Sequence, residues 1–348
     1  MPGAGERAYA YAKACGIIGK SFIGKRIRRL EGVSRLSELD RMVFSEASRD
    51  LPEKELLVDL EKRITGHSVK SIISIVKSFS NVPEFLKLLV RSYEYADLKT
   101  AISNIHEGDG KAPVHTDIGE FQTVKFDAWP DLPSMIRGTE FVFLLDKKKG
   151  ADEKQAVILM QTLLDRHYYS VLWESLMSLP RNDRCVSEKI LADEISLRNS
   201  GWALRLRTYY QMTAEEVKSH LVNLPVRGKS PYGAAPVPHT LAHDALVCLE
   251  FPLDNFPAWS AWRWNDFLNP ESGGRPWRVD PRYFQNAASL YLYNLSRRYF
   301  RSRPFSLDTV FCFIKLKQFE EDVLTSSIEG LGMGMALRDI FSMLGVES

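Results

Sequence analysis

The chain has 348 residues, of which 45% are apolar and 26% are charged, a composition that is typical of globular proteins and excludes a disordered or fibrous chain. Its 46 basic residues nearly balance its 44 acidic ones, and the net charge of +2 argues against a general binder of nucleic acid. A chain of this length can bury a core that needs no metal or disulfide bond for stability.

The cysteines and the apolar runs indicate the compartment. Cys15, Cys185, Cys248 and Cys312 lie far apart without Cys-x-x-Cys spacing, which favours free thiols in a reducing compartment over disulfide bonds or a zinc site. The N-terminal residues do not resemble a signal peptide, and no run of about 18 apolar residues is present to span a bilayer. We therefore expect a cytoplasmic protein that reaches a membrane only through a partner.

Most of the chain is predicted to be α-helical. Helix starts are indicated at Ser34, at Thr213 with Glu216 as a capping box, and at Ser306. Apolar residues recur at steps of three and four, which places them on one helix face; they are Ile72, Ile73, Val76 and Phe79, then Val157, Met160, Leu164, Tyr168, Val171 and Leu172, then Leu290, Leu295 and Tyr299.

The non-helical predictions are few. Residues 141–144 form either a short strand or part of the helix that follows. Two segments rich in glycine and proline, 106–119 and 227–238, are predicted to be loops near domain boundaries.

Three parts of the chain share the same order of features. Each has an apolar helix start, a middle helix and a late acidic element. The helix starts lie at 36–44, 132–141 and 256–262. The acidic elements lie at 93–99, 193–198 and 319–324. Equivalent points, Leu36 to Asp97, Leu132 to Ser196 and Phe256 to Asp322, are 61, 64 and 66 residues apart. This spacing predicts three diverged helical units, with boundaries at 1–117, 118–224 and 225–348, the last with a longer tryptophan-rich insertion.

A phosphate-binding loop is suggested by Gly19-Lys20-Ser21, but the pattern fails. Ala14 stands where the motif needs a glycine, and no apolar strand precedes the segment. We interpret the small residues as a close approach between helices. Two basic runs, 25–29 and 297–303, are interpreted as solvated or partner-facing helix surfaces.

A metal site is suggested by His239 and His243, which share one face of a helix and have Asp244 beside them. Thr240 replaces the glutamate that a zincin motif needs, and no third ligand is predicted. A surface helix without metal is the favoured interpretation.

Four tryptophans lie close together in the chain. Together with Asp266 and Glu271 they suggest a carbohydrate cleft, but their spacing favours a bulky core or an interface anchor; they are Trp259, Trp262, Trp264 and Trp277. The role of 256–277 stays open, and no Ser/His/Asp or Cys/His set has local support.

The acidic element of the repeat resembles a known family. Its pattern, acidic-x-x-(Asn/Asp)-(Leu/Val)-(Lys/Arg) in 93–99, resembles a signature of the central-stalk C-subunit family of V-type and archaeal-type ATPases, known as the d subunit in eukaryotes. The resemblance covers nearly the whole chain, and the other matching stretches are 9–14, 137–141, 165–169, 304–310 and 315–322. In the third copy, Phe319 stands where the acid is expected and Leu324 where a basic residue is expected.

The resemblance implies an all-α funnel of three similar helical domains around a pseudo-threefold axis. It also implies a non-catalytic rotor subunit that receives the D and F shaft subunits and sits on the membrane ring of c/K-type proteolipid subunits. Such a subunit transmits torque for ATP-coupled ion transport. Catalytic residues, cofactors, metals and nucleic acid are not expected.

Two other functions are weighed against this one: a helical-repeat adaptor unrelated to ATPases, and an enzyme that uses the tryptophan-rich region. The repeated carboxylates Glu94, Asp97 and Asp193 are interpreted as caps or partners of neighbouring helices, not as reactive acids.

Overall fold

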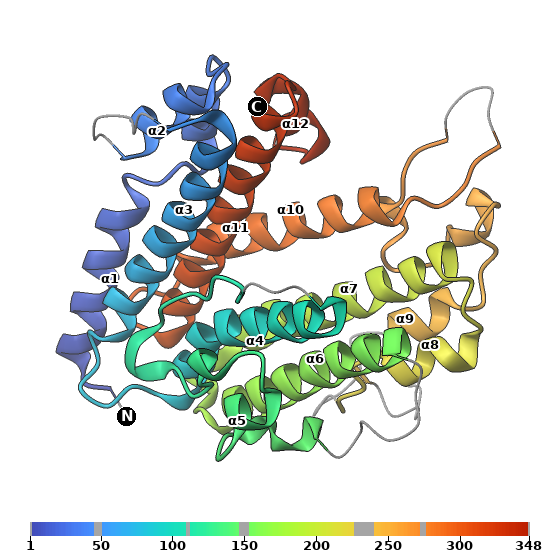
Figure 1. Ribbon diagram of the computed structural model, residues 1–348, viewed down its shortest axis with the longest axis horizontal. Coiled ribbons are helices and arrows are strands. Elements are labelled where there is room, and N and C mark those ends of the chain that lie inside the picture. The colour runs from blue at the N-terminus through green and yellow to red at the C-terminus, as the bar shows by residue number, and fades with distance from the viewer. Residues whose placement is uncertain are drawn as a thin grey trace. The chain divides into compact units, whose positions relative to one another are not determined.

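The computed structural model describes residues 2–44, 51–108, 112–145, 153–225, 240–271 and 276–346. Within these ranges the regular elements are α-helices and 3₁₀ helices, and an isolated antiparallel bridge joins Pro225 and Thr240 (Figure 1). The all-α prediction is therefore confirmed. None of the helices in these ranges is long and apolar enough to cross a membrane. The predicted loop 227–238 and His239 lie outside the described residues.

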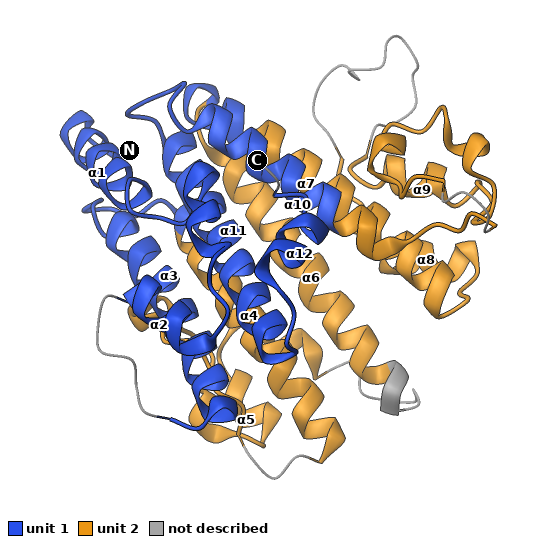
Figure 2. Ribbon diagram, turned by 90° about the horizontal axis from the view of Figure 1, so that it is seen from above, with its two compact units in different colours: residues 1–86, 181–187, 286–348 blue, residues 87–180, 188–285 orange. Residues whose placement is uncertain are grey.

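The chain divides into two compact units, coloured separately in Figure 2. Unit 1 comprises residues 1–86, 181–187 and 286–348, and unit 2 comprises residues 87–180 and 188–285. Three helices contribute residues to both units: α4 (Glu84–Glu107), α7 (Arg181–Tyr209) and α10 (Pro281–Tyr299). The boundaries predicted from the repeat, at 117 and 224, stay a prediction.

Unit 1 is built around α11. Besides most of α10, its elements are α1 (Ala4–Ile18), the 3₁₀ helix η1 (Gly24–Leu30), α2 (Leu36–Phe44), α3 (Glu53–Val76), α11 (Leu307–Gly332) and α12 (Leu337–Met343). Helices α3 and α11 run side by side, and α1 and α2 pack against both (Figure 1). Phe311, Phe313 and Ile314 on α11 are fully buried, as expected for a helix that is apolar on several faces.

Glycines near the end of α11 allow close packing. A Cβ at Gly332 would lie 2.6 Å from Leu57 Cδ1 of α3, and one at Gly330 would lie 2.0 Å from Ile340 Cδ1 of α12. A side chain at either position would therefore force the side chain of Leu57 or Ile340 to move.

Unit 2 combines long helices with short 3₁₀ helices in the segments between them. Besides most of α4 and α7, it has α5 (Leu132–Ile136), α6 (Glu153–Ser178), α8 (Ala214–His220), α9 (His243–Cys248) and the 3₁₀ helices η2 (Gly119–Phe121), η3 (Phe126–Ala128), η4 (Glu140–Leu144), η5 (Phe256–Trp259) and η6 (Asn265–Phe267). Tyr95 on α4 packs on Tyr168 of α6 with ring centroids 5.0 Å apart, and Arg198 of α7 binds Asp165 of α6 at 3.0 Å. These contacts join α4, α6 and α7.

Most predicted helix signals are confirmed. The face predicted over 157–172 belongs to α6, and the capping box at Thr213 opens α8, where Thr213 N–H donates to Glu216 at 2.7 Å. Ser306 is the N-cap residue of α11, although its hydroxyl donates to the carbonyl of Arg303. Helix α2 begins at Leu36, two residues after Ser34.

Both alternatives for 141–144 are wrong, because these residues form the 3₁₀ helix η4 and α6 begins only at Glu153. Thr139 starts the turn by accepting the N–H of Phe141 at 3.1 Å. In a 3₁₀ helix, residues three apart lie on the same face. Phe141 and Leu144 are accordingly buried, whereas Val142 is 42% exposed.

Candidate functional site

A buried glutamate on α4 holds a distant segment of unit 2. Glu94 is 1% exposed, and its Oε2 accepts a hydrogen bond from Arg91 Nε at 2.8 Å. Its Oε1 accepts the N–H groups of Thr123 and Val124, the latter at 2.7 Å. One carboxylate therefore balances a guanidinium and satisfies two backbone amides, which fixes residues 123–124 against α4.

Arg91 connects this carboxylate to η4. Its Nη1 donates to Glu140 at 3.1 Å, and the hydroxyl of Tyr95 donates to the other oxygen of Glu140 at 2.7 Å. Burial by itself lowers the pKa of Arg91, but Glu94 and Glu140 outweigh it and raise that pKa. The guanidinium therefore stays charged inside the unit and holds two carboxylates.

Unit 1 contains the same arrangement on α11. Glu320 is 5% exposed, accepts the backbone N–H of Phe22 at 2.5 Å and forms an ion pair with Lys317. The spacing is that of Arg91 and Glu94, with the basic residue three positions before the glutamate. We call the two arrangements carboxylate clasps, each formed by a buried basic residue, the glutamate three residues later and the backbone amide of a distant segment.

The other repeated acids also bind neighbouring segments. Asp97 accepts the N–H of Thr116 at 2.6 Å, and Asp193 forms an ion pair with Arg263 at 2.5 Å. Burial raises the pKa of Asp97, while the hydrogen bonds from Thr116 oppose the rise. The acids are engaged in hydrogen bonds and ion pairs, but their prediction as caps or partners of neighbouring helices is wrong in one respect, because these contacts hold non-helical segments at 116, 123–124 and 263.

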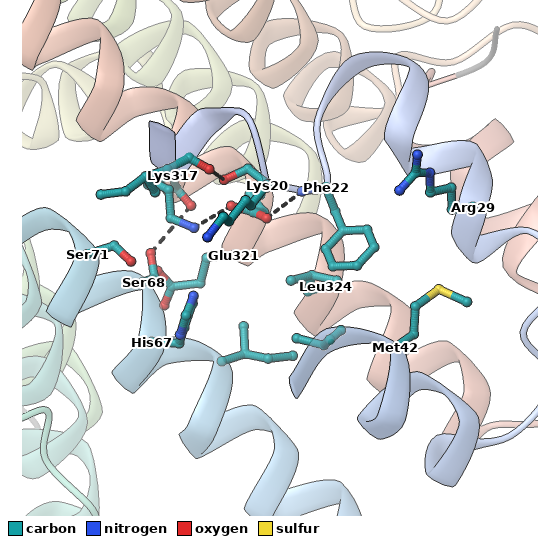
Figure 3. A pocket seen from close by; sticks show the side chains of 15 residues that line it. Lys20, Phe22, Arg29, Met42, His67, Ser68, Ser71, Lys317, Glu321 and Leu324 are labelled. Carbon is teal, nitrogen blue, oxygen red and sulfur yellow. Dashed lines mark hydrogen bonds and ion pairs between the residues drawn. The ribbon is translucent and has the colours of Figure 1, made fainter. Parts of the chain in front are cut away.

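The clasp of unit 1 lies at a cavity of about 440 Å³ (Figure 3). One side of the cavity is polar, with Lys20, His67, Ser68 and Lys317, and Ser68 Oγ donates to the carbonyl of Lys317 at 3.4 Å. Burial and the nearby Lys317 lower the pKa of His67, which favours its neutral form.

The other side of this cavity is apolar. Phe22, Met42 and Leu324 line it, and Met42 is 40% exposed. Figure 3 shows that Lys20 and Arg29 lie apart from each other: Lys20 lies on the polar side, and Arg29 lies beyond Phe22. A cavity with charged groups at separate points and an apolar wall suits contact with an amphipathic surface.

The Gly-Lys-Ser segment does not form a phosphate cradle. It follows the C-terminal end of α1, and the N–H groups of Gly19, Lys20 and Ser21 donate to carbonyls of the preceding helical turn at 2.8, 2.9 and 3.2 Å. A phosphate loop needs free amides at the N-terminal end of a helix. The helix end here presents the partial negative charge of the dipole, which disfavours phosphate.

Of the suggested metal ligands, the structure describes His243 and Asp244. Asp244 is buried, and its Oδ2 accepts hydrogen bonds from Ser196 at 2.6 Å and from Arg263 at 3.2 Å. Its carboxylate is therefore engaged in joining α7 to α9. In the described ranges no three His, Cys, Asp or Glu side chains are grouped as a metal site.

The tryptophans form part of the core of unit 2. All four are at most 8% exposed, and each indole N–H donates a hydrogen bond, with acceptors that are mainly backbone carbonyls; they are Trp259, Trp262, Trp264 and Trp277. Asp266 and Glu271 are exposed instead of facing an aromatic cleft. The core interpretation is confirmed, and no sugar platform forms at these residues.

Sequence reasoning missed three residues that matter here: Glu320, Arg263 and Asp308. The repeat predicts the acid of the third copy at 319, whereas the structure places the clasp at Glu320. The signal that identifies it is a basic residue three positions before a glutamate in an apolar helix, present in 91–94 and 317–320. Asp308, which accepts Ser187 N–H at 2.8 Å, has no comparable sequence signal.

Taken together, both units define a helical protein whose buried charges hold chain segments in fixed positions. The profile of the family described as "ATP synthase (C/AC39) subunit" matches residues 40–227. This match covers more than half of the chain, and the chain belongs to this family. The resemblance to the C-subunit family of V-type and archaeal-type ATPases is thereby confirmed.

A relative without an assigned function matches over a longer range. The chain is 28% identical, over 329 residues, to an uncharacterised protein of Treponema pallidum (strain Nichols). The aligned region covers 94% of this chain and 93% of that protein, so the similarity extends well beyond the residues that match the family profile.

Proposed function

We propose that this chain is a non-catalytic central-stalk subunit of a V/A-type rotary ATPase. In this role it connects the D and F shaft subunits to the membrane ring of proteolipid subunits and transmits torque between ATP turnover and ion movement. Membership of the ATP synthase (C/AC39) subunit family carries the proposal. Contact with the membrane would go through the ring.

The packing within each unit supports a mechanical role. A torque-transmitting part needs to resist deformation, and buried hydrogen-bonded ion pairs are costly to break, at about 3–5 kcal/mol when one partner is removed. Each unit has such a pair in its clasp, at Arg91 and Glu94 and at Lys317 and Glu320. Close-packed helices transmit strain because their interiors have low compressibility.

The proposal includes three helical domains, 1–117, 118–224 and 225–348, related by a pseudo-threefold axis. The recurrence of the clasp at Glu94 and Glu320 supports a common origin for the first and third of them. In the second, the repeated acid Asp193 forms an ion pair with Arg263.

The decisive experiment is reconstitution with defined partners. The tagged chain is mixed with purified D and F subunits and, separately, with the detergent-solubilised proteolipid ring of the same ATPase, and each mixture is analysed by size-exclusion chromatography. We expect one complex with D and F and a second with the ring. A chain that binds neither would overturn the proposal and favour an unrelated adaptor.

Salt dependence tests the nature of the contact. Charged side chains such as Lys20 and Arg29 could contribute to the surface that binds the D and F shaft. If they do, the affinity for the shaft falls as the salt concentration is raised from about 50 to 500 mM, because salt screens exposed charges. An affinity that does not change with salt would contradict a charged seat.

A further inference from the structure

Unit 2 contains a second cavity, of about 220 Å³, that the proposed torque role does not use. It is lined by residues of four helices: Lys99 of α4, Asp165 of α6, Arg198, Trp202 and Arg205 of α7, and His220 of α8. The helices α4, α6 and α7 are joined here by ion pairs, so the walls of the cavity are fixed by the fold.

The lining is electropositive. Among the described residues it contains three cations, Lys99, Arg198 and Arg205, against the carboxylate of Asp165. Both Lys99 and Arg198 bind that one carboxylate. Glu194 and Arg198 both hydrogen-bond to the hydroxyl of Tyr169, and counting this acid with Asp165 still leaves an excess of positive charge.

Arg198 is held in a fixed orientation. Its guanidinium lies 5.3 Å from the ring centroid of Tyr169 and 5.2 Å from that of Trp202, and it binds Asp165 at 3.0 Å. The guanidinium is therefore preorganised, and the side chain of Arg198, which is 38% exposed, lines the cavity beside Asp165.

Two further donors remain available. Arg205 is exposed and has no hydrogen bond or ion pair to any residue that the structure describes. Burial lowers the pKa of Lys99, so its ammonium is incompletely stabilised by Asp165 and would gain from an additional anion.

His220 closes one side of the cavity. Its Nδ1 lies 3.0 Å from the hydroxyl of Thr162, and burial together with Arg166 lowers its pKa. When the Thr162 hydroxyl donates to Nδ1, the imidazole is neutral and its Nε2 carries the hydrogen. An anion in the cavity would favour protonation of this ring, so His220 is a natural reporter.

We propose that this cavity binds a small, multiply charged oxyanion of the phosphate class. Arginine forks and a lysine ammonium are the groups that proteins use to bind phosphate oxygens. The volume is below the roughly 300–1,000 Å³ of sites for drug-sized ligands, which favours phosphate or pyrophosphate over a whole nucleotide.

The test titrates inorganic phosphate, pyrophosphate and ADP, at constant ionic strength, into the whole purified chain by calorimetry. We expect saturable binding, tightest for pyrophosphate, and a rise of the His220 pKa in NMR spectra when the anion is present. Arg205→Gln is expected to weaken binding by about tenfold or more, since hydrogen bonds to charged groups contribute about 1.5–3 kcal/mol.

Lys218→Gln is the matched control, because Lys218 is an exposed cation on α8 that lies outside the cavity lining. It is expected to leave the affinity unchanged, and both variants should keep the melting temperature of the parent. Equal losses in the two variants, or no saturable binding, would overturn the proposal. A third result would also overturn the proposal: no oxyanion binds to the parent chain, but Arg205→Gln weakens its binding to D and F. The cavity would then be assigned to an acidic partner.

This experiment does not depend on the proposed rotor role, because it uses the isolated chain. If the oxyanion binds but the chain does not bind D, F or the ring, the oxyanion site is supported and the rotor role is contradicted. Preferred binding of ADP over pyrophosphate would instead show that the phosphate belongs to a larger ligand, and would overturn the assignment to a small anion.

Discussion

The carboxylate of Glu320 accepts the backbone N–H of Phe22 at 2.5 Å, although the two residues are 298 positions apart in the chain. Lys317 forms the ion pair that balances the charge of Glu320. The contact joins the segment after α1 to the middle of α11, and both belong to unit 1. Its strength can be measured by substitution.

Glu320→Ala is expected to lower the free energy of unfolding by about 3–5 kcal/mol, because it leaves the Lys317 ammonium buried without a partner. Urea denaturation monitored by circular dichroism measures the loss. The double variant Lys317→Met and Glu320→Met should recover much of it, since no charge remains buried. Glu53→Gln, at an exposed position in the same unit, is the control, and a comparable loss there would contradict the explanation.

The tryptophan core gives a second test. Trp259 is fully buried and its indole N–H donates to the carbonyl of Pro252 at 2.8 Å, so Trp259→Ala should cost about 3–5 kcal/mol of stability. Asp266→Asn, at an exposed position in the same region, should change stability by less than about 0.5 kcal/mol. Thermal unfolding separates these outcomes. A small effect of Trp259→Ala would mean that the ring is not a core residue.

Glu6 predicts a pH dependence. Its carboxylate accepts hydrogen bonds from Ser80 N–H and hydroxyl and from Gly3 N–H, which hold its pKa at about 2. Because folding lowers the pKa of Glu6, its ionised carboxylate contributes to the stability of the folded chain. This contribution is fully present above the unfolded pKa of 4.5 and is lost as the pH falls through about 2.

Glu6→Gln should therefore lose less stability than the parent between about pH 5 and pH 2. Chemical denaturation at a series of pH values measures this difference. Glu53→Gln, an exposed substitution in the first turn of α3, is the control and should follow the parent. Identical pH profiles for Glu6→Gln and the parent would rule out the hydrogen-bonded carboxylate as a source of acid sensitivity.

The cysteines should differ sharply in reactivity. Cys185 is exposed and contacts Arg303, whereas Cys248 and Cys312 are fully buried, and burial raises the pKa of Cys248 to about 12. A thiol reagent should modify Cys185 first in the native chain and reach the two buried thiols only after unfolding. Mass spectrometry of timed samples shows the order, and Cys185→Ser should abolish the fast phase.

Helix positions could be predicted from the sequence because their causes are local. The capping box of Thr213 and Glu216 and the apolar face of α6 depend on residues within a few turns of each other. The spacing of the tryptophans favours a core or an interface anchor, and only their burial in the structure identifies them as core residues.

The clasps could not be predicted, because their partners are distant in sequence. Nothing near Glu94 indicates that Val124 will present its amide there, and the same holds for Glu320 and Phe22. The repeat predicts the third-copy acid at Phe319, one position too early, because residue types alone do not show which side of the helix faces the partner amide. A one-residue shift rotates a position by about 100° around a helix.

The division of the chain between the units has a consequence for synthesis. Unit 1 needs residues from the beginning, the middle and the end of the chain, because α3 packs along α11. Unit 2 is complete once residue 285 has left the ribosome, whereas the N-terminal helices must wait for the last sixty or so residues. A nascent chain of which about the first 300 residues have left the ribosome would therefore carry an ordered unit 2 and exposed apolar helix faces, which is the state in which chaperones would be expected to engage it.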